Sequence, residues 1–212
     1  MTPASFFQEK GINVSRETFH RLQLYEETLL KWQTSHNLIS NSTVSSIWNR
    51  HFLDSAQLVP YISPSIKTIA DLGSGAGFPG VVIALLTEIP TILIESNQKK
   101  ASFLREIQRI TQAPVTILSK RIEDTPSLQV DLITARAVSQ LSTLMEYAFL
   151  HLNTHGLCLF LKGKDIEKEV KEAHKKWNFL EKKYLSITDC TGVILEIQKI
   201  KKKATIKEVE SD

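Results

Sequence analysis

The chain has 212 residues, of which 42% are hydrophobic and 23% are charged, and its formal net charge is +3. These values are typical of a soluble globular protein with one domain, or one domain plus an extension. No apolar run reaches the roughly 18 residues of a membrane helix, the N-terminus does not resemble a signal peptide, and the two cysteines form neither a disulfide framework nor a zinc motif. We therefore expect a cytoplasmic protein without a membrane or metal partner.

Residues 1–65 are predicted to form an N-terminal helical extension without strands. A helix is expected to start near Ser15, because serine is a frequent N-cap. Apolar side chains then recur at steps of three and four, which predicts a core-facing stripe made of Leu22, Tyr25, Leu29 and Trp32. A second helix is predicted over about residues 43–59, with buried positions at Ile47, Phe52 and Leu58.

Residues 66–203 alternate between short apolar runs and helical patterns. The runs predict strands at 67–72, 91–95, 114–118, 130–135, 157–161, 184–187 and 192–200. Four helical patterns lie between these runs, which implies parallel βαβ crossovers, and none lies between the last two. Because only a short turn joins the last two, they must be antiparallel. We predict an α/β, Rossmann-like domain with a seven-stranded, mostly parallel sheet and one antiparallel strand, followed by a charged tail at 204–212.

The segment IADLGSGAGFPG, residues 69–80, follows the first predicted strand and fits two cofactors. Ligands of an open parallel sheet bind at the carboxyl ends of its strands, so a ligand is expected here. The dinucleotide fingerprint is matched by Gly75, Gly77 and Gly80. The glycine loop that binds S-adenosylmethionine is matched by Gly73, Gly75 and Gly77.

Asp71, two residues before the first of these glycines, separates the two cofactors. A carboxylate here would repel the pyrophosphate that a dinucleotide places on a helix N-terminus. S-adenosylmethionine has no phosphate, and its ammonium and sulfonium groups can be attracted by Asp71. Glu95 closes the next strand and can bind the ribose that both cofactors contain. The residues favour S-adenosylmethionine over a dinucleotide or a turn without a ligand.

The loop DLGSGAGFPG resembles that of the glucose-inhibited division protein B family, the bacterial methyltransferases that make 7-methylguanosine in 16S ribosomal RNA. Further segments match in order and spacing: LLKWQTSHNLIS, RHFLDS, ESNQKKASFLREI, KRIED, ITARAVSQL and FLKGK. The resemblance implies a class I S-adenosylmethionine-dependent methyltransferase fold and this activity. The C-terminal segment KIKKKATIKEVESD departs from the proline- and glycine-containing tail of many members.

The resemblance also implies which residues hold the cofactor: Gly73, Phe78, Ile122, Glu123 and Arg136. Phe78 and Ile122 can form an apolar slot for adenine, and Glu123 can accept a hydrogen bond from its amino group. Arg136 follows the fourth strand and can clamp the cofactor carboxylate or a substrate phosphate. The competing interpretations are a core contact for Phe78, a solvated acid for Glu123 and a surface salt bridge for Arg136.

Four residues are expected to contact RNA: Arg50, His51, Arg121 and Lys162. In RHFLDS, His51 and Asp54 share one helical face, so they can form a base with its orienting acid. They can equally form a structural hydrogen bond that packs the N-terminal helices over the sheet. Residues 162–212 hold thirteen lysines against ten acids, which suits phosphate contacts or a solvated surface. No catalytic residue is assigned.

The sequence excludes two common classes of methyl acceptor but does not identify the acceptor atom. Methyltransferases of exocyclic amines place an Asn/Asp-Pro-Pro-aromatic motif after the fourth strand, where this chain reads TARAVS. Attack at pyrimidine carbon 5 needs a nucleophilic cysteine. Cys158 is expected in mid-strand and Cys190 in a hairpin loop far from the site, so neither fits. An acceptor with a free lone pair is left, which agrees with the guanine nitrogen 7 that the resemblance implies.

The expected partners are S-adenosyl-L-methionine and 16S ribosomal RNA, either naked or within the small ribosomal subunit. The target base must be unstacked, and the protein is expected to be a monomer. The alternative within the same cofactor class is a methyltransferase with a small-molecule or protein acceptor. A nicotinamide-dependent redox enzyme and a non-catalytic RNA-binding protein are alternatives from other classes.

Overall fold

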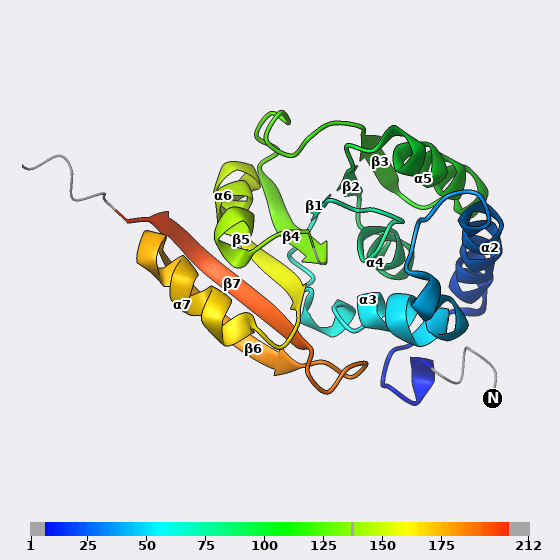
Figure 1. Ribbon diagram of the computed structural model, residues 1–212, viewed down its shortest axis with the longest axis horizontal. Helices are drawn as coiled ribbons and strands as arrows, with labels where there is room; N and C mark the ends of the chain where they lie inside the picture. Colours follow the sequence, from blue (N-terminus) through cyan, green and yellow to red (C-terminus); the bar gives the residue numbers. More distant parts are fainter. Residues whose placement is uncertain (1–6, 137, 204–212) are drawn as a thin grey trace, which may run out of the picture.

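The computed structural model describes residues 7–136 and 138–203 as one seven-stranded sheet with helices on both faces (Figure 1). The strands are β1 (Ile69–Leu72), β2 (Thr91–Ile94), β3 (Val115–Leu118), β4 (Val130–Arg136), β5 (Leu152–Lys162), β6 (Trp177–Leu185) and β7 (Val193–Lys202). Their order in the sheet is β3-β2-β1-β4-β5-β7-β6. Only β7 runs against its neighbours, so the predicted fold class is confirmed.

The helices form two layers around the sheet (Figure 1). One layer contains α2 (Arg16–Gln33), α4 (Gly80–Thr87) and α5 (Gln98–Thr111), and the other contains α6 (Leu141–His151) and α7 (Ile166–Lys176). Each layer packs its own apolar cluster against the sheet. The strand order reverses between β1 and β4, which places the switch point, where such sheets bind ligands, after these two strands.

The first long helix forms as its sequence predicts. The hydroxyl of Ser15 accepts a hydrogen bond from the backbone N–H of Thr18 at 3.0 Å and caps the first turn of α2. The apolar stripe buries Leu22, Tyr25 and Leu29 completely, whereas Trp32 is partly buried against the same cluster. The predicted helix start and core face are therefore confirmed.

The prediction of one continuous helix over about residues 43–59 is wrong. This segment is broken into a 3₁₀ helix η1 (Asn41–Ser46), a π-helix η2 (Trp48–Leu53), a short α3 (Asp54–Ala56) and a 3₁₀ turn η3 (Val59–Tyr61). The expected buried positions are nevertheless buried: Ile47, Phe52 and Leu58. Tertiary packing explains the difference, because the ring of Trp48 stacks at 4.5 Å on that of Phe52, within an aromatic cluster that also contacts α2 and α4.

The N-terminal segment shares a core with the sheet-bearing part of the chain. Side chains from both sides of the predicted boundary at residue 65 belong to one buried cluster. Arg21 of α2 donates hydrogen bonds to the carbonyls of Thr111 and Gln112 at 2.6 and 2.7 Å, which caps the C-terminal end of α5. The boundary stays a prediction, and the predicted tail at 204–212 lies outside the described residues.

The last hairpin is longer than the sequence predicts. A strand was expected at 184–187, but β6 starts at Trp177, directly after α7. Its first half alternates buried Trp177 and Phe179 with exposed Asn178 and Leu180. Charged residues on this edge strand hide the alternation, as is common where an edge must resist pairing with another chain. Within residues 7–136 and 138–203, no helix has the length and apolar character needed to cross a membrane.

Candidate functional site

The glycine loop between β1 and α4 requires glycine for its backbone path. Gly75 and Gly77 have φ angles of +58° and +95°, a region that residues with a Cβ rarely adopt. A Cβ on Gly77 would lie 2.6 Å from the hydroxyl of Tyr25. A Cβ on Gly75 would meet only the carbonyl oxygen of Gly73, at 3.9 Å. The loop is therefore tightly packed at Gly77, whereas there is open space next to Gly75.

Asp71 is the third of the four residues of β1 and is completely buried. Its Oδ1 accepts a hydrogen bond from the hydroxyl of Thr134 at 2.7 Å. Its Oδ2 has no hydrogen-bond partner among the described residues and packs under the first turn of α4, where a Cβ on Gly80 would lie 2.8 Å away. Burial raises the pKa of Asp71 to about 6, although the Thr134 hydroxyl opposes the shift. The carboxylate faces β4 and α4, so its predicted contact with a cofactor stays a prediction.

Glu95 lies directly after β2 and holds the glycine loop. Its Oε2 accepts a hydrogen bond from the backbone N–H of Gly75 at 2.8 Å, and its Oε1 accepts one from the N–H of Asn97 at 2.7 Å. The side chain is 8% exposed. Each carboxylate oxygen can accept a further hydrogen bond. Glu95 therefore joins the ends of β1 and β2 and can still receive hydroxyl groups of a ligand.

Phe78 and Ile122 belong to different buried clusters, and their predicted contacts with adenine stay a prediction. Phe78 is 3% exposed and stacks on Tyr25 with ring centroids 5.1 Å apart. Ile122 belongs to the cluster on the other face of the sheet. The aromatic rings of the N-terminal segment cover Phe78. The ring of Phe78 forms a cation–π contact with Arg136, whose guanidinium carbon lies 5.2 Å from the ring centroid.

Arg136 ends β4 and is held by the N-terminal segment. One terminal nitrogen donates to the backbone carbonyl of Arg50 at 3.0 Å and to Oδ2 of Asp54 at 3.3 Å. The other terminal nitrogen lies 2.9 Å from Nδ1 of His51. The predicted pairing of His51 with Asp54 is therefore replaced by a shared arginine. Sequence spacing placed the two residues on one face, but only the fold brings Arg136 between them.

His51 is neutral in this arrangement. Burial lowers its pKa to about 3, and the guanidinium groups of Arg136 and Arg50 lower it in the same direction. Because an arginine only donates, Nδ1 must accept the hydrogen bond from Arg136, and the ring proton resides on Nε2. That nitrogen lies 2.8 Å from the hydroxyl of Thr43. Both ring nitrogens of His51 are thus engaged by protein groups.

A pocket of about 340 Å³ opens beside Arg136. It lies at the carboxyl ends of β4 and β5, between the N-terminal segment and the loop that joins β6 to β7. The described residues that line it are Thr43, Arg50, His51, Asp54, Arg136, Leu161, Lys162, Gly163, Ser186, Asp189, Gly192 and Val193. This volume lies within the usual range of small-ligand sites. Of the residues predicted from sequence, Arg50, His51, Arg136 and Lys162 meet here.

The loop between β6 and β7, residues 186–192, is fastened to the N-terminal segment. The Thr188 hydroxyl donates to Oδ1 of Asp54 at 2.6 Å, and the backbone N–H of Ile187 donates to the side-chain carbonyl of Gln57 at 2.9 Å. Arg50 forms an ion pair with Asp189 at 3.0 Å. The expectation that this loop lies far from the site is therefore wrong.

Sequence reasoning missed Gln57, Thr188 and Asp189, because nothing in a short hairpin turn signals a contact with residues about 130 positions earlier. Cys190 shares the loop and is exposed, but it is not among the residues that line the pocket. Cys158 is buried in β5, where desolvation raises the pKa of its thiol far above the usual value. Neither thiol is placed to attack a base in the pocket.

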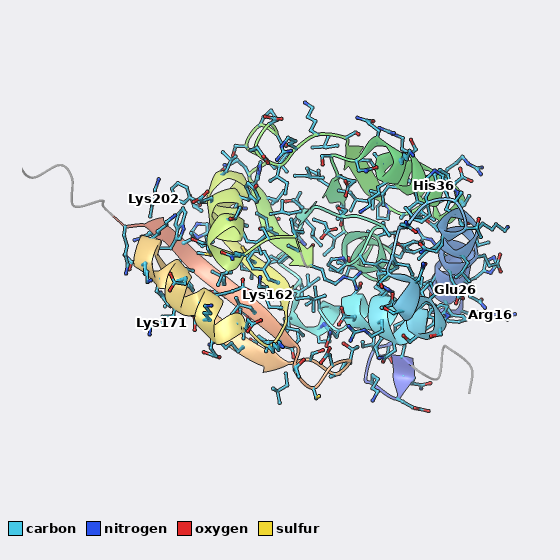
Figure 2. The ribbon with its side chains drawn as sticks, in the orientation of Figure 1. Arg16, Glu26, His36, Lys162, Lys171 and Lys202 are labelled. Atoms are coloured by element: carbon cyan, nitrogen blue, oxygen red, sulfur yellow. The ribbon has the colours of Figure 1, made fainter. Side chains whose placement is uncertain are left out.

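The remaining predicted residues lie in two other settings. Arg121 and Glu123 form an exposed ion pair at 2.8 Å after β3, and the Tyr147 hydroxyl lies 3.4 Å from the Glu123 carboxylate. Lys162 lies nearer the centre of the molecule than Lys171 and Lys202 (Figure 2). Its side chain is 7% exposed and pairs with Glu169 at 2.6 Å. A phosphate contact by Lys162 would have to displace that carboxylate.

The chain is similar to known proteins over most of its length. Residues 18–200 match the family model described as rRNA small subunit methyltransferase G. The chain is 44% identical over 200 residues to the ribosomal RNA small subunit methyltransferase G of Paramagnetospirillum magneticum, covering 94% of this chain and 97% of the relative. It is also 44% identical over 189 residues to that of Gluconobacter oxydans, covering 89% and 97%.

Among solved structures, the chain is similar to a ribosomal protein L11 methylase from Lactobacillus delbrueckii subsp. bulgaricus, with a TM-score of 0.58. The two sequences are 15% identical, and the match covers 76% of this chain and 80% of that one. At this identity the likeness shows a shared fold. The family model and the relatives decide the family, and the resemblance seen in the sequence is confirmed: the chain belongs to the rRNA small subunit methyltransferase G family.

Proposed function

We propose that this protein transfers the methyl group of S-adenosylmethionine to ring nitrogen 7 of a guanosine in 16S ribosomal RNA. Family membership supports the reaction class and the RNA, since the relatives are named ribosomal RNA small subunit methyltransferase G. The pocket at the ends of β4 and β5 offers space for an acceptor base next to Arg136, whose guanidinium lies over Phe78. The residues around the pocket favour an acceptor atom from which no proton has to be removed.

The residues around the glycine loop fit S-adenosylmethionine. The open space above Gly75 admits a ligand next to the backbone, and Glu95 offers acceptor oxygens to the ribose hydroxyls at the end of β2. Glu123 is placed after β3, where an adenine amino group is expected in this fold. When bound, the cofactor supplies an electrophilic methyl group. The chain has to hold it, align it with the acceptor and exclude water.

The proposal rests mainly on one observation, which is that His51 and Asp54, the predicted base and its orienting acid, are hydrogen-bonded to other protein groups. Nδ1 of His51 accepts from Arg136, and its Nε2 faces Thr43. Oδ1 of Asp54 accepts from Thr188 and Gln57, and its Oδ2 faces Arg136. A general base must have a free lone pair and a pKa near the working pH. His51 meets neither requirement in this arrangement, because both ring nitrogens have protein partners and its pKa is lowered to about 3.

Guanine nitrogen 7 suits a site of this kind. It carries an unshared electron pair at neutral pH and bears no proton, so methylation there requires no proton removal. Alignment of the two reactants then supplies most of the acceleration. An exocyclic amine would lose a proton on methylation, and carbon 5 of a pyrimidine would need a thiolate. With Cys158 buried in β5 and Cys190 outside the pocket lining, the described residues supply no such thiolate.

Arg136 is proposed to position the reactants. Three hydrogen bonds to Arg50, Asp54 and His51 fix its guanidinium, and an arginine has five N–H donors. The donors left over can bind the carboxylate of the cofactor or a phosphate of the RNA. Asp54, fastened in turn to the β6–β7 loop, neutralises part of the positive charge. The target base enters unstacked, from naked RNA or from the small ribosomal subunit.

Methyl transfer to 16S ribosomal RNA tests the proposal. The purified protein is incubated with S-adenosylmethionine and 16S ribosomal RNA that lacks the modification, both naked and in small subunits. Mass spectrometry of the nucleosides should show 7-methylguanosine. Reduction followed by aniline should cut the RNA at one position, only when enzyme and cofactor were both present. Methylation of small molecules or proteins instead, or of an RNA amine or carbon, contradicts the proposal.

A further inference from the structure

We propose that the ion pair of Arg50 and Asp189 binds the Watson–Crick edge of the target guanine and selects guanine over other purines. This inference rests on the proposed function and names the part of the pocket that recognises the base. Both residues line the pocket. One comes from η2 and the other from the loop between β6 and β7, so they meet only because that loop is fastened to the N-terminal segment.

Hydrogen bonds fix the orientation of the Asp189 carboxylate, while Arg50 and Asp189 both stay accessible to a ligand. Oδ1 of Asp189 accepts hydrogen bonds from the backbone N–H and the hydroxyl of Thr191, at 2.9 and 2.8 Å. Its Oδ2 accepts one from Arg50 at 3.0 Å and has room for a second, because a carboxylate oxygen has two lone pairs. The side chains of Arg50 and Asp189 are 43% and 35% exposed. A ligand can reach them without unfolding the loop.

The two side chains present a donor next to an acceptor. The guanidinium of Arg50 has N–H groups beyond the one that binds Asp189, and Oδ2 of Asp189 accepts. Guanine offers the matching order on one edge, with acceptor O6 for the guanidinium and, beyond N1–H, the donor N2–H₂ for the remaining lone pair of Oδ2. Adenine reverses it, with an amino donor beside a bare N1 acceptor. Bound in this orientation, adenine would place donor against donor and acceptor against acceptor.

This orientation leaves nitrogen 7 free. The Watson–Crick edge of guanine and nitrogen 7 belong to different sides of the base, so the pair does not consume the reacting lone pair. Asp54, the other carboxylate that lines the pocket, cannot take this role, because Thr188, Gln57 and Arg136 already use its oxygens. Oδ2 of Asp54 also accepts only one hydrogen bond, but its partner is Arg136 and the side chain is 19% exposed, against 35% for Asp189.

The test replaces one functional group of the base. After the methylated guanosine has been mapped, 16S ribosomal RNA is prepared with either guanosine or inosine at that position. Inosine keeps nitrogen 7, O6 and N1–H and lacks only the amino group at carbon 2. The ratio of kcat/KM for the two RNAs is measured with the wild type and with Asp189→Asn. The Asn variant keeps an Oδ1 for Thr191, so the loop fold is retained.

The wild type should methylate the inosine RNA about 10- to 100-fold less efficiently, the loss expected for one hydrogen bond to a carboxylate. In Asp189→Asn the preference should fall to about threefold or less, while S-adenosylmethionine affinity is unchanged. The matched control is Asp165→Asn, an exposed aspartate at the start of α7 that does not line the pocket. It should keep the wild-type ratio.

The outcomes separate the two proposals. If the wild type forms 7-methylguanosine but uses inosine equally well, the recognition by Asp189 is wrong and the proposed function stands. The same holds if the preference survives in Asp189→Asn. If no 7-methylguanosine forms in naked RNA or in small subunits, the proposed function itself is wrong. Thermal unfolding of both variants shows whether a change in ratio reflects recognition or loss of the fold.

Discussion

Arg136 donates a hydrogen bond to Nδ1 of His51 at 2.9 Å, although 85 positions separate the two residues in the chain. The contact joins the end of a central strand to a π-helix of the N-terminal segment. It holds the arginine over Phe78 and keeps His51 neutral. The wall of the pocket is therefore built by contacts between distant parts of the chain.

Arg136→Lys is expected to reduce kcat/KM for RNA methylation by at least about tenfold, because lysine keeps the charge but loses the planar fork that reaches three partners. Initial rates at varied RNA concentration measure the effect. Arg109→Lys is the matched control, since Arg109 is exposed on α5 and pairs only with Glu106. Equal activity in both variants would exclude a positioning role for Arg136.

Methyl transfer on bound RNA should be nearly independent of pH from about pH 6.5 to 8.5. The reason is that nitrogen 7 loses no proton and that His51, with a pKa lowered to about 3, stays neutral throughout this range. Single-turnover rates with saturating RNA and cofactor measure it. A steep rise over this interval that disappears in His51→Ala would show that a proton is removed, and would contradict the lone-pair mechanism.

Acid should weaken the contribution of His51 to stability. Its pKa is lowered from about 6.5 to about 3 on folding, so below pH 6.5 the unfolded chain binds a proton that the folded chain excludes. The free energy of unfolding lost in His51→Gln should therefore shrink between about pH 6.5 and pH 3. Urea unfolding of both proteins at several pH values measures this difference. A difference that grows on acidification would mean that His51 is charged in the folded state.

Glu95→Ala is expected to weaken S-adenosylmethionine binding by about tenfold or more, since a hydrogen bond to a carboxylate contributes about 1.5–3 kcal/mol. The carboxylate also positions the N–H of Gly75, so its loss loosens the glycine loop. Calorimetric titration with the cofactor measures the affinity. The control Glu106→Ala removes a partly exposed acid on α5 whose ion-pair partner is Arg109, and it should leave affinity unchanged. Unaltered binding in Glu95→Ala would rule out this residue as a cofactor ligand.

Gly77→Ala should lower the free energy of unfolding by at least about 2 kcal/mol, through overpacking and a strained backbone. The new Cβ would lie 2.6 Å from the Tyr25 hydroxyl and 2.8 Å from Val81. Gly163→Ala is the control, because nothing lies within 4 Å of a Cβ there, and it should change stability by less than about 0.5 kcal/mol. Denaturant unfolding compares the two, and equal stability would mean that the loop is not tightly packed.

The parallel sheet, the glycine loop and the family could be predicted from the amino-acid sequence. Alternating strand and helix patterns, glycines at residues 73, 75 and 77, and an acid at the end of each of the first two strands are local signals. They depend on backbone sterics and on side-chain periodicity within a few residues. The α2 helix, with its Ser15 cap and buried stripe, was predictable for the same reason. Even the buried positions of the broken segment 41–61 followed from apolar spacing.

Only the tertiary structure decided which side chains share the pocket. The aromatic rings of the N-terminal segment cover Phe78, which lies in a different buried cluster from Ile122. Asp189 enters the site because Thr188 and Gln57 fasten a distant loop beside it. Such contacts depend on the summed geometry of helices and strands, and burial then sets the protonation of His51 and Asp71. No local pattern in the chain carries that information.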